Sequence, residues 1–136
     1  MAKIERFEDL RIWQEARKIC QFIDVLLRDT KLKTHYSLAD QMDRSSGSVM
    51  DNIAEGFDRE GNKEFIHFLS IAKGSCAETK SQSYRALDKR LISTEQHQKL
   101  YDMLEAEINQ IGGMMSYLSK SDYKGTKFKK FTDHKR

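Results

Sequence analysis

Hydrophobic residues recur every three or four positions along four stretches of the chain, which is the spacing of amphipathic α-helices. The four stretches cover residues 9–29, 37–55, 62–90 and 94–119. Short polar connectors separate them, so the pattern predicts an all-α fold, an antiparallel up-down-up-down four-helix bundle. We expect residues 1–119 to form this bundle as one domain, followed by a flexible, basic C-terminal tail at residues 120–136.

The same spacing predicts which side of each helix is buried. In the first helix the predicted core positions are Trp13, Ala16, Cys20, Ile23 and Leu27, flanked by Ile12, Ile19 and Leu26. In the second they are Leu38, Met42, Ser45, Val49, Ile53 and Gly56, and in the fourth Leu100, Leu104, Ile108, Ile111, Met115 and Leu118. Polar and small residues should set the helix ends: Asp9 and Ser37 at two starts, Gly56 as a terminator, and Ser93 with Gln96 as a capping box.

The segment RSSGSVMDNIAEGFDREGN, residues 44–62, places small and polar side chains in the middle of this pattern. On a helical wheel of about 100° per residue, its polar members form a stripe beside the core seam. The stripe contains Gln41, Arg44, Ser48, Asn52 and Glu55, and a similar stripe on the third helix contains Glu64, Ile71, Ser75, Glu78 and Gln82. We therefore predict a hydrogen-bonded network between the second and third helices.

On the helical wheel, Gly47 and Ala54 of the second helix and Gly74 of the third point away from the core. A glycine inside a helix costs about 1 kcal/mol relative to alanine. Close approach of another backbone would explain why glycine rather than alanine occupies such a position. These three residues are therefore candidates for an interface with a second copy of the chain. The alternative is that the exposed glycines are simply tolerated.

Composition narrows the class of protein. The chain has no proline in 136 residues, which suits long unbroken helices. Its N-terminal MAKIERFEDL is too charged for a signal peptide, and no apolar run reaches the ~20 residues of a membrane span. Its two cysteines lack CxxC spacing, so we expect a soluble, cytoplasmic protein with no membrane partner.

Positive charge is concentrated at the C-terminus. Residues 120–136 hold seven Lys/Arg against two Asp, whereas the preceding 119 residues hold 17 Lys/Arg and 19 Asp/Glu. Lysines there alternate with aromatic residues, a combination that can displace counterions from phosphates and stack on unpaired bases. The candidates for contact with RNA or DNA are Lys124, Lys127, Phe128, Lys129, Lys130, Phe131, Lys135 and Arg136. The alternative is a solubilising extension, or one whose aromatic residues dock on a neighbouring subunit.

Catalytic and metal-binding patterns are weak in this sequence. Glu64 and His67 form an ExxH, but a di-iron bundle needs a second ExxH and two more inward glutamates. The wheel also places His67 off the core seam of its helix. No nucleophile has a base at helical spacing, so we predict a protein that is not an enzyme, holds no metal and needs no cofactor.

Two segments carry a family resemblance: FEDLRIW near the N-terminus, and RSSGSVMDNIAEGFDREGNKEFIHFLSIAKGSCAE from Arg44 onward. They resemble the four-helix-bundle family encoded by 23S rRNA intervening sequences, over roughly residues 7–119. The resemblance implies a structural or assembly role for the matching positions. These are Arg44, Ser48, Asn52, Glu55, Gly56, Phe65, Phe68, Gly74, Ser75 and Glu78.

That family is similar to the accessory variability protein of diversity-generating retroelements, a ring-shaped pentamer that works beside a reverse transcriptase and binds nucleic acid through basic surfaces. The resemblance implies a non-enzymatic, homo-oligomeric scaffold or accessory protein, a pentameric ring, with RNA or DNA and a reverse transcriptase as partners. The net negative charge of residues 1–119 departs from such a basic surface. The alternative function is a protein–protein interaction module with no direct nucleic-acid role.

Overall fold

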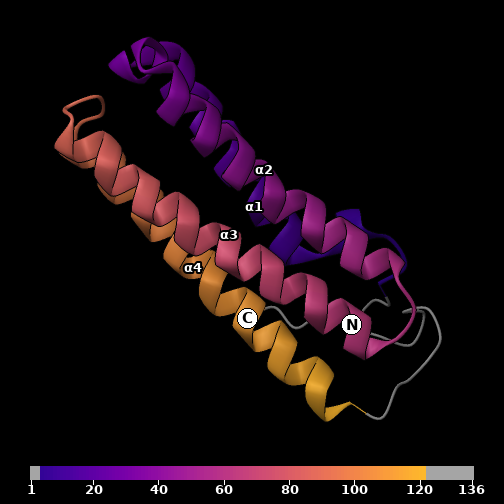
Figure 1. Cartoon of the computed structure of the whole chain (residues 1–136). Helices are drawn as coiled ribbons and strands as arrows, with labels where there is room; N and C mark the ends of the chain where they lie inside the picture. The colour runs from indigo at the N-terminus through magenta and orange to yellow at the C-terminus, as the bar shows by residue number, and fades with distance from the viewer. Residues whose placement is uncertain (1–3, 122–136) are drawn as a thin grey trace.

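The computed structural model describes residues 4–121, and four long α-helices account for most of them. The helices are α1 at Arg11–Asp29, α2 at Tyr36–Asp58, α3 at Asn62–Asp88 and α4 at Thr94–Lys120. Two short 3-10 helices, η1 at Phe7–Asp9 and η2 at Lys31–Thr34, precede α1 and α2. Successive helices run in opposite directions (Figure 1), so the predicted all-α four-helix bundle is confirmed.

Each helix packs against the helix that follows it in the chain, and α1 closes the bundle against α4. The pair formed by α2 and α3 shares the most extensive contact, and the two lie side by side in Figure 1. All four helices contribute completely buried side chains to one core, including Ile19, Ile53, Leu69 and Leu104. Burial of each such side chain stabilises the fold by about 1.5–3 kcal/mol, which explains why the apolar seams govern the arrangement.

The buried face of α1 is displaced from the predicted one. Trp13, Cys20 and Leu27 are only half-buried. The buried side chains of the helix are Ile12, Ala16, Ile19, Ile23 and Leu26. Both sets have helical spacing and adjoin each other on the wheel, so apolar periodicity alone does not decide which set lies at the centre. As a result, Trp13 lies at the surface of the bundle and not in its core.

The helix starts also differ from the predicted ones. Asp9 belongs to η1, and Leu10 occupies the N-cap position of α1 without a side-chain cap. The second helix begins at Tyr36, one residue before Ser37. The predicted capping box of α4 is confirmed, because Gln96 N donates to Ser93 Oγ at 3.0 Å and Ser93 N donates to Gln96 Oε1 at 2.8 Å.

Gly56 does not end the second helix, which continues to Asp58. A Cβ at Gly56 would lie 2.7 Å from Phe68 Cβ and 3.0 Å from Phe65 Cδ1. Glycine is therefore required at this position because α3 approaches the backbone of α2 too closely for a side chain. The turn that follows uses Gly61, whose φ of 86° lies in the left-handed region that favours glycine.

Candidate interaction surfaces

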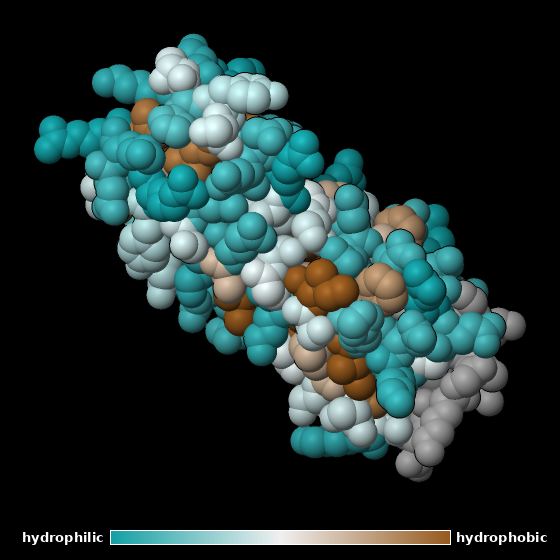
Figure 2. Space-filling view, viewed as in Figure 1, coloured by the Kyte–Doolittle hydropathy of each residue, from teal (hydrophilic) through white to brown (hydrophobic). Residues whose placement is uncertain are grey.

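The outer side of α2 and α3 carries the three predicted interface residues. A Cβ at Gly47 or Gly74 would have no atom of another element within 4 Å, so both positions face open space. Gly74 is exposed, whereas Gly47 and Ala54 are half-buried. Ile71 lies three residues before Gly74 and is 40% exposed, which adds an apolar side chain to this outer side. In Figure 2 small areas of hydrophobic surface show between hydrophilic side chains on the side where α2 and α3 lie.

Directly beneath this surface, polar side chains join the two helices. Ser75 Oγ on α3 donates to Ser48 Oγ on α2 at 2.8 Å. Asn52 Nδ2, one turn further along α2, donates to the same Ser48 oxygen at 2.9 Å and to the Ser48 carbonyl oxygen at 2.8 Å. The predicted network between the two polar stripes is thus confirmed for these three residues.

A second, deeper group continues the network toward the other end of the pair. Ser45 Oγ donates to Gln82 Oε1 at 2.7 Å and lies 2.7 Å from Thr79 Oγ1, with which it also hydrogen-bonds. All three side chains are at least 95% buried. Hydrogen bonds between buried groups contribute about 0.5–1.5 kcal/mol each, whereas a buried group that loses its partner costs about 1–3 kcal/mol. This layer therefore fixes the register of α2 against α3.

Of the charged members of the stripes, Glu78 contacts these buried groups through Gln82, whereas Arg44 and Glu55 do not. Arg44 pairs with Asp40 at 2.9 Å, and Glu55 pairs with Arg59 at 2.7 Å, each within its own helix and exposed to water. Glu78 Oε2 accepts a hydrogen bond from Gln82 Nε2 at 3.5 Å. The two exposed ion pairs, Asp40–Arg44 and Glu55–Arg59, contribute about 0–1 kcal/mol each, so the network depends mainly on the neutral side chains.

The aromatic motif residues support the end of α2 instead. Phe65 is fully buried beside Gly56, and its ring meets Phe57 edge-on at 6.0 Å between centroids. Phe68 is half-buried, and the Arg59 guanidinium lies 4.9 Å from the centroid of its ring. These contacts close the α2–α3 turn, which makes the role of Phe65 and Phe68 structural.

The structure gives the titratable residues no metal-binding arrangement within residues 4–121. Glu64 and His67 are exposed, and no group of three His, Cys, Asp or Glu side chains in this part of the chain could hold a metal ion. Cys20 and Cys76 are free thiols. Burial raises the pKa of Cys20 to about 11 and that of Cys76 further, so both thiols are protonated and poor nucleophiles at neutral pH.

The structure contains a buried carboxyl group in α4 that the sequence pattern does not predict. Glu107 is 1% exposed, and neither of its carboxyl oxygens has a hydrogen-bond partner among residues 4–121. Burial, with a smaller contribution from Glu15, raises the pKa of Glu107 to about 9, so the side chain is neutral at pH 7. The spacing of Glu107 in the sequence could have indicated its burial, since it lies three residues after Leu104 and four before Ile111, both buried.

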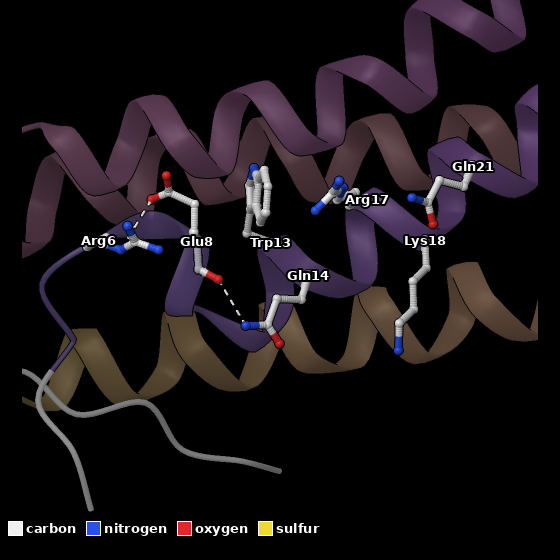
Figure 3. Close-up of a pocket in the computed structure, with 7 residues that line it drawn as sticks. All are labelled: Arg6, Glu8, Trp13, Gln14, Arg17, Lys18 and Gln21. Carbon is white, nitrogen blue, oxygen red and sulfur yellow. Dashed lines mark hydrogen bonds and ion pairs between the residues drawn. The ribbon is translucent and has the colours of Figure 1, made fainter.

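The displaced seam of α1 leaves an open groove of about 520 Å³ along that helix. Its lining residues are Arg6, Glu8, Trp13, Gln14, Arg17, Lys18 and Gln21. Figure 3 shows the indole of Trp13 standing between Glu8 and Arg17, with Gln14 and Lys18 directed to the other side of the helix. The apolar spacing of α1 predicts a core position for Trp13 and therefore does not predict this surface.

The nucleic-acid candidates from Lys124 to Arg136 lie outside the residues that the structure describes. None of the described helices is long and apolar enough to cross a membrane. Within the described range, the features that this fold offers for recognition are two surfaces: the outer side of α2 and α3, and the groove beside α1.

The fold and these surfaces define a four-helix-bundle protein in which polar layers join the α2–α3 pair. The chain belongs to the 23S rRNA-intervening sequence protein family, whose family model matches residues 8–116. The resemblance seen in the sequence is therefore confirmed.

A solved structure shares this fold. It is the crystal structure of a protein with unknown function from the S23 ribosomal protein family of Bacteroides thetaiotaomicron. It is 18% identical in sequence, with a TM-score of 0.67, and the match covers 76% of this chain and 97% of that one. No curated protein matches the chain.

Proposed function

We propose that the chain is a non-enzymatic, homo-oligomeric scaffold or accessory protein that assembles into a closed ring and contacts RNA or DNA. The observation that carries the assembly is the open space at Gly47 and Gly74 on the outer side of the most extensively packed helix pair. A helix-interior glycine without a neighbour costs about 1 kcal/mol relative to alanine. A second copy packed there could bring one of its helices close to these glycines, and the resulting contact would offset that cost.

The polar layer under this side supports the same proposal. Ser48, Asn52 and Ser75 hold α2 against α3, so the pair presents its outer side as one rigid surface. Ring closure through a rigid heterologous contact fixes the number of subunits by the angle between copies. The family resemblance implies five subunits.

Light scattering tests the assembly. The wild-type protein should have a mass that is a multiple of 15.9 kDa, and Gly47→Leu should reduce it. Gly113→Leu is the matched control, because Gly113 is a helix-interior glycine with open space around its Cβ position and lies in α4, outside the α2–α3 pair. A monomeric wild-type protein, or an unchanged mass in both Gly47→Leu and Gly74→Leu, would overturn the proposed interface.

The contact with nucleic acid is assigned to the basic C-terminus. Filter binding of structured RNA across a salt series compares the full-length protein with a variant in which Lys127, Lys129 and Lys130 are replaced by glutamine. Each lysine that displaces counterions from phosphates should contribute about 0.7–0.9 to the slope of log affinity against log salt. The charge-matched control replaces Lys31, Lys33 and Lys63, which are exposed in the bundle. Equal affinity in the tail variant and the control would contradict this assignment.

A second candidate is a protein-interaction module that binds a nucleic-acid enzyme such as a reverse transcriptase. It is favoured by the charge of residues 1–119, which hold 17 Lys/Arg against 19 Asp/Glu. A nearly neutral body is better suited to a protein partner than to extended contact with a phosphate backbone. Ring-sized wild-type protein that binds no RNA at any salt concentration would select this candidate.

A further inference from the structure

The groove beside α1 combines an aromatic ring with positive charge. Among its lining residues, Arg6, Arg17 and Lys18 are cations and Glu8 is the single carboxylate. Two of the cations have acidic neighbours: Arg6 Nε lies 4.0 Å from Glu8 and 3.7 Å from Asp9. The ammonium of Lys18 lies 3.5 Å from Glu15. These pairs are exposed and exchange readily with an incoming anion.

Arg17 is the cation available for a ligand. Across residues 4–121 no carboxylate lies within ion-pair distance of its guanidinium, and its contact is with the Trp13 ring. The guanidinium carbon lies 5.9 Å from the ring centroid, at the outer limit of cation–π range. The guanidinium therefore lies over the indole only loosely, and it can turn outward to a phosphate and leave the ring face to a planar group.

The indole itself is held in place from one side. Phe7 meets Trp13 edge-on, with 5.2 Å between ring centroids and an interplanar angle of 60°. Trp13 remains half-buried, so part of its ring is accessible from the groove. A fixed aromatic face beside exposed cations is the arrangement on which unpaired bases stack. Gln21 adds an amide group that can hydrogen-bond to a base edge.

We propose that this groove binds single-stranded nucleic acid, with one unpaired base stacked on Trp13 and a flanking phosphate contacted by Arg17. A duplex would bring the phosphates but keep its bases stacked internally. The chain's own C-terminus, with seven Lys/Arg against two Asp, carries the wrong charge for this groove. The inference rests on the nucleic-acid role in the proposed function, and it assigns a separate contact site on α1.

Trp13 provides the readout, because it is the single tryptophan of the chain. Oligo-uridylate of about twelve nucleotides, within the usual range of site sizes, is titrated into the full-length protein while its tryptophan fluorescence is recorded. We expect saturable quenching at low salt, and much weaker quenching by an RNA duplex of the same length. An acidic peptide that quenches while the oligonucleotide does not would instead identify a protein ligand and overturn the proposal.

Affinity is measured in parallel by the fluorescence anisotropy of a labelled oligonucleotide. Arg17→Gln should weaken binding about threefold to tenfold, as expected for loss of one phosphate contact at low salt. Arg28→Gln is the matched control, since Arg28 is an exposed cation of α1 that pairs with Asp29 outside the groove. Trp13→Phe should retain most of the affinity and Trp13→Ala should lose about tenfold.

The tail variant with glutamine at positions 127, 129 and 130 separates this inference from the proposed function. Binding that disappears in the tail variant, without quenching in the wild type, overturns the groove but leaves the proposed nucleic-acid role. Quenching and Arg17-dependent binding that persist in the tail variant support the groove and contradict the tail assignment. Absence of any oligonucleotide binding overturns both.

Discussion

The hydroxyl oxygens of Ser48 on α2 and Ser75 on α3 lie 2.8 Å apart and form a hydrogen bond across the helix pair. Ser48 also accepts a hydrogen bond from Asn52, so its oxygen is the point where two donors from two helices converge. A side chain without such an oxygen would leave both donors without this partner. The position of Ser48 in the sequence is thus explained by two neighbours, one of them 27 residues away in the chain.

Replacement of Ser48 by alanine should destabilise the bundle by about 1–2 kcal/mol, because Ser75 Oγ and Asn52 Nδ2 both lose an acceptor. Ser70→Ala is the matched control. Its hydroxyl is exposed and bonds to the His67 carbonyl of its own helix, so its loss should change stability little. Urea unfolding monitored by circular dichroism measures both variants, and equal midpoints would show that the Ser48 layer contributes nothing.

The glycines of the bundle should respond in opposite directions to alanine. Gly56→Ala should destabilise by about 1–3 kcal/mol, since its Cβ would lie 2.7 Å from Phe68 Cβ. Gly113→Ala should stabilise by about 0.5–1 kcal/mol, because its Cβ meets open space and alanine favours the helix. Thermal unfolding of the two variants provides the comparison. A Gly56→Ala protein as stable as the wild type would refute the close-contact explanation.

Stability should fall as pH rises because of Glu107. The pKa of this group in the folded protein is about 9, above its ordinary value of 4.5, so between these values the folded state keeps a proton that the unfolded state releases. The free energy of unfolding should therefore decrease toward high pH by up to about 1.4 kcal/mol per unit.

The variant Glu107→Gln removes the titrating proton, and it should be more stable than the wild type at pH 8 and similar to it near pH 4. Chemical unfolding at several pH values tests this difference. Glu15 and Cys76, the other titratable groups near Glu107, are retained in both proteins. An equal pH dependence in wild type and variant would show that Glu107 does not control it.

A hydrogen bond from Asn62 joins the start of α3 to the end of α4. Its Nδ2 donates to the Leu118 carbonyl oxygen at 3.0 Å in a buried setting. Asn62→Ala should destabilise by about 1 kcal/mol and should speed hydrogen exchange of the last turn of α4. Asn109→Ala, at an exposed position of α4, serves as the control. Unchanged exchange near Leu118 in Asn62→Ala would exclude this role.

Periodicity was sufficient for the fold because each helix has a continuous apolar seam. The polar layer was also predictable, since Ser48, Asn52 and Ser75 lie beside those seams at helical spacing. The sequence wrongly predicts Gly56 as a helix terminator, because local rules do not reveal that Phe68 of the next helix approaches it. Such a contact depends on tertiary packing.

The candidate sites were less predictable than the fold. Trp13 was assigned to the core because two adjoining apolar sets on α1 both fit a buried face. Glu107 was overlooked because a carboxylate is normally taken as solvent-exposed, although its spacing placed it among buried residues. Both errors arise where hydrophobic pattern and side-chain chemistry give conflicting signals.

The alternating direction of the helices gives the bundle two unlike ends. One end gathers the start of α1 with Trp13, the α2–α3 turn, and the last residues of α4 near Leu118 (Figure 1). The other holds η2 and the α3–α4 turn with the exposed Lys89 and Arg90. If the copies in a ring stood parallel, the ring would therefore have two different faces, one formed by each end of the bundle. These faces would differ chemically, and a strand of nucleic acid arriving at one face would not meet the same groups at the other.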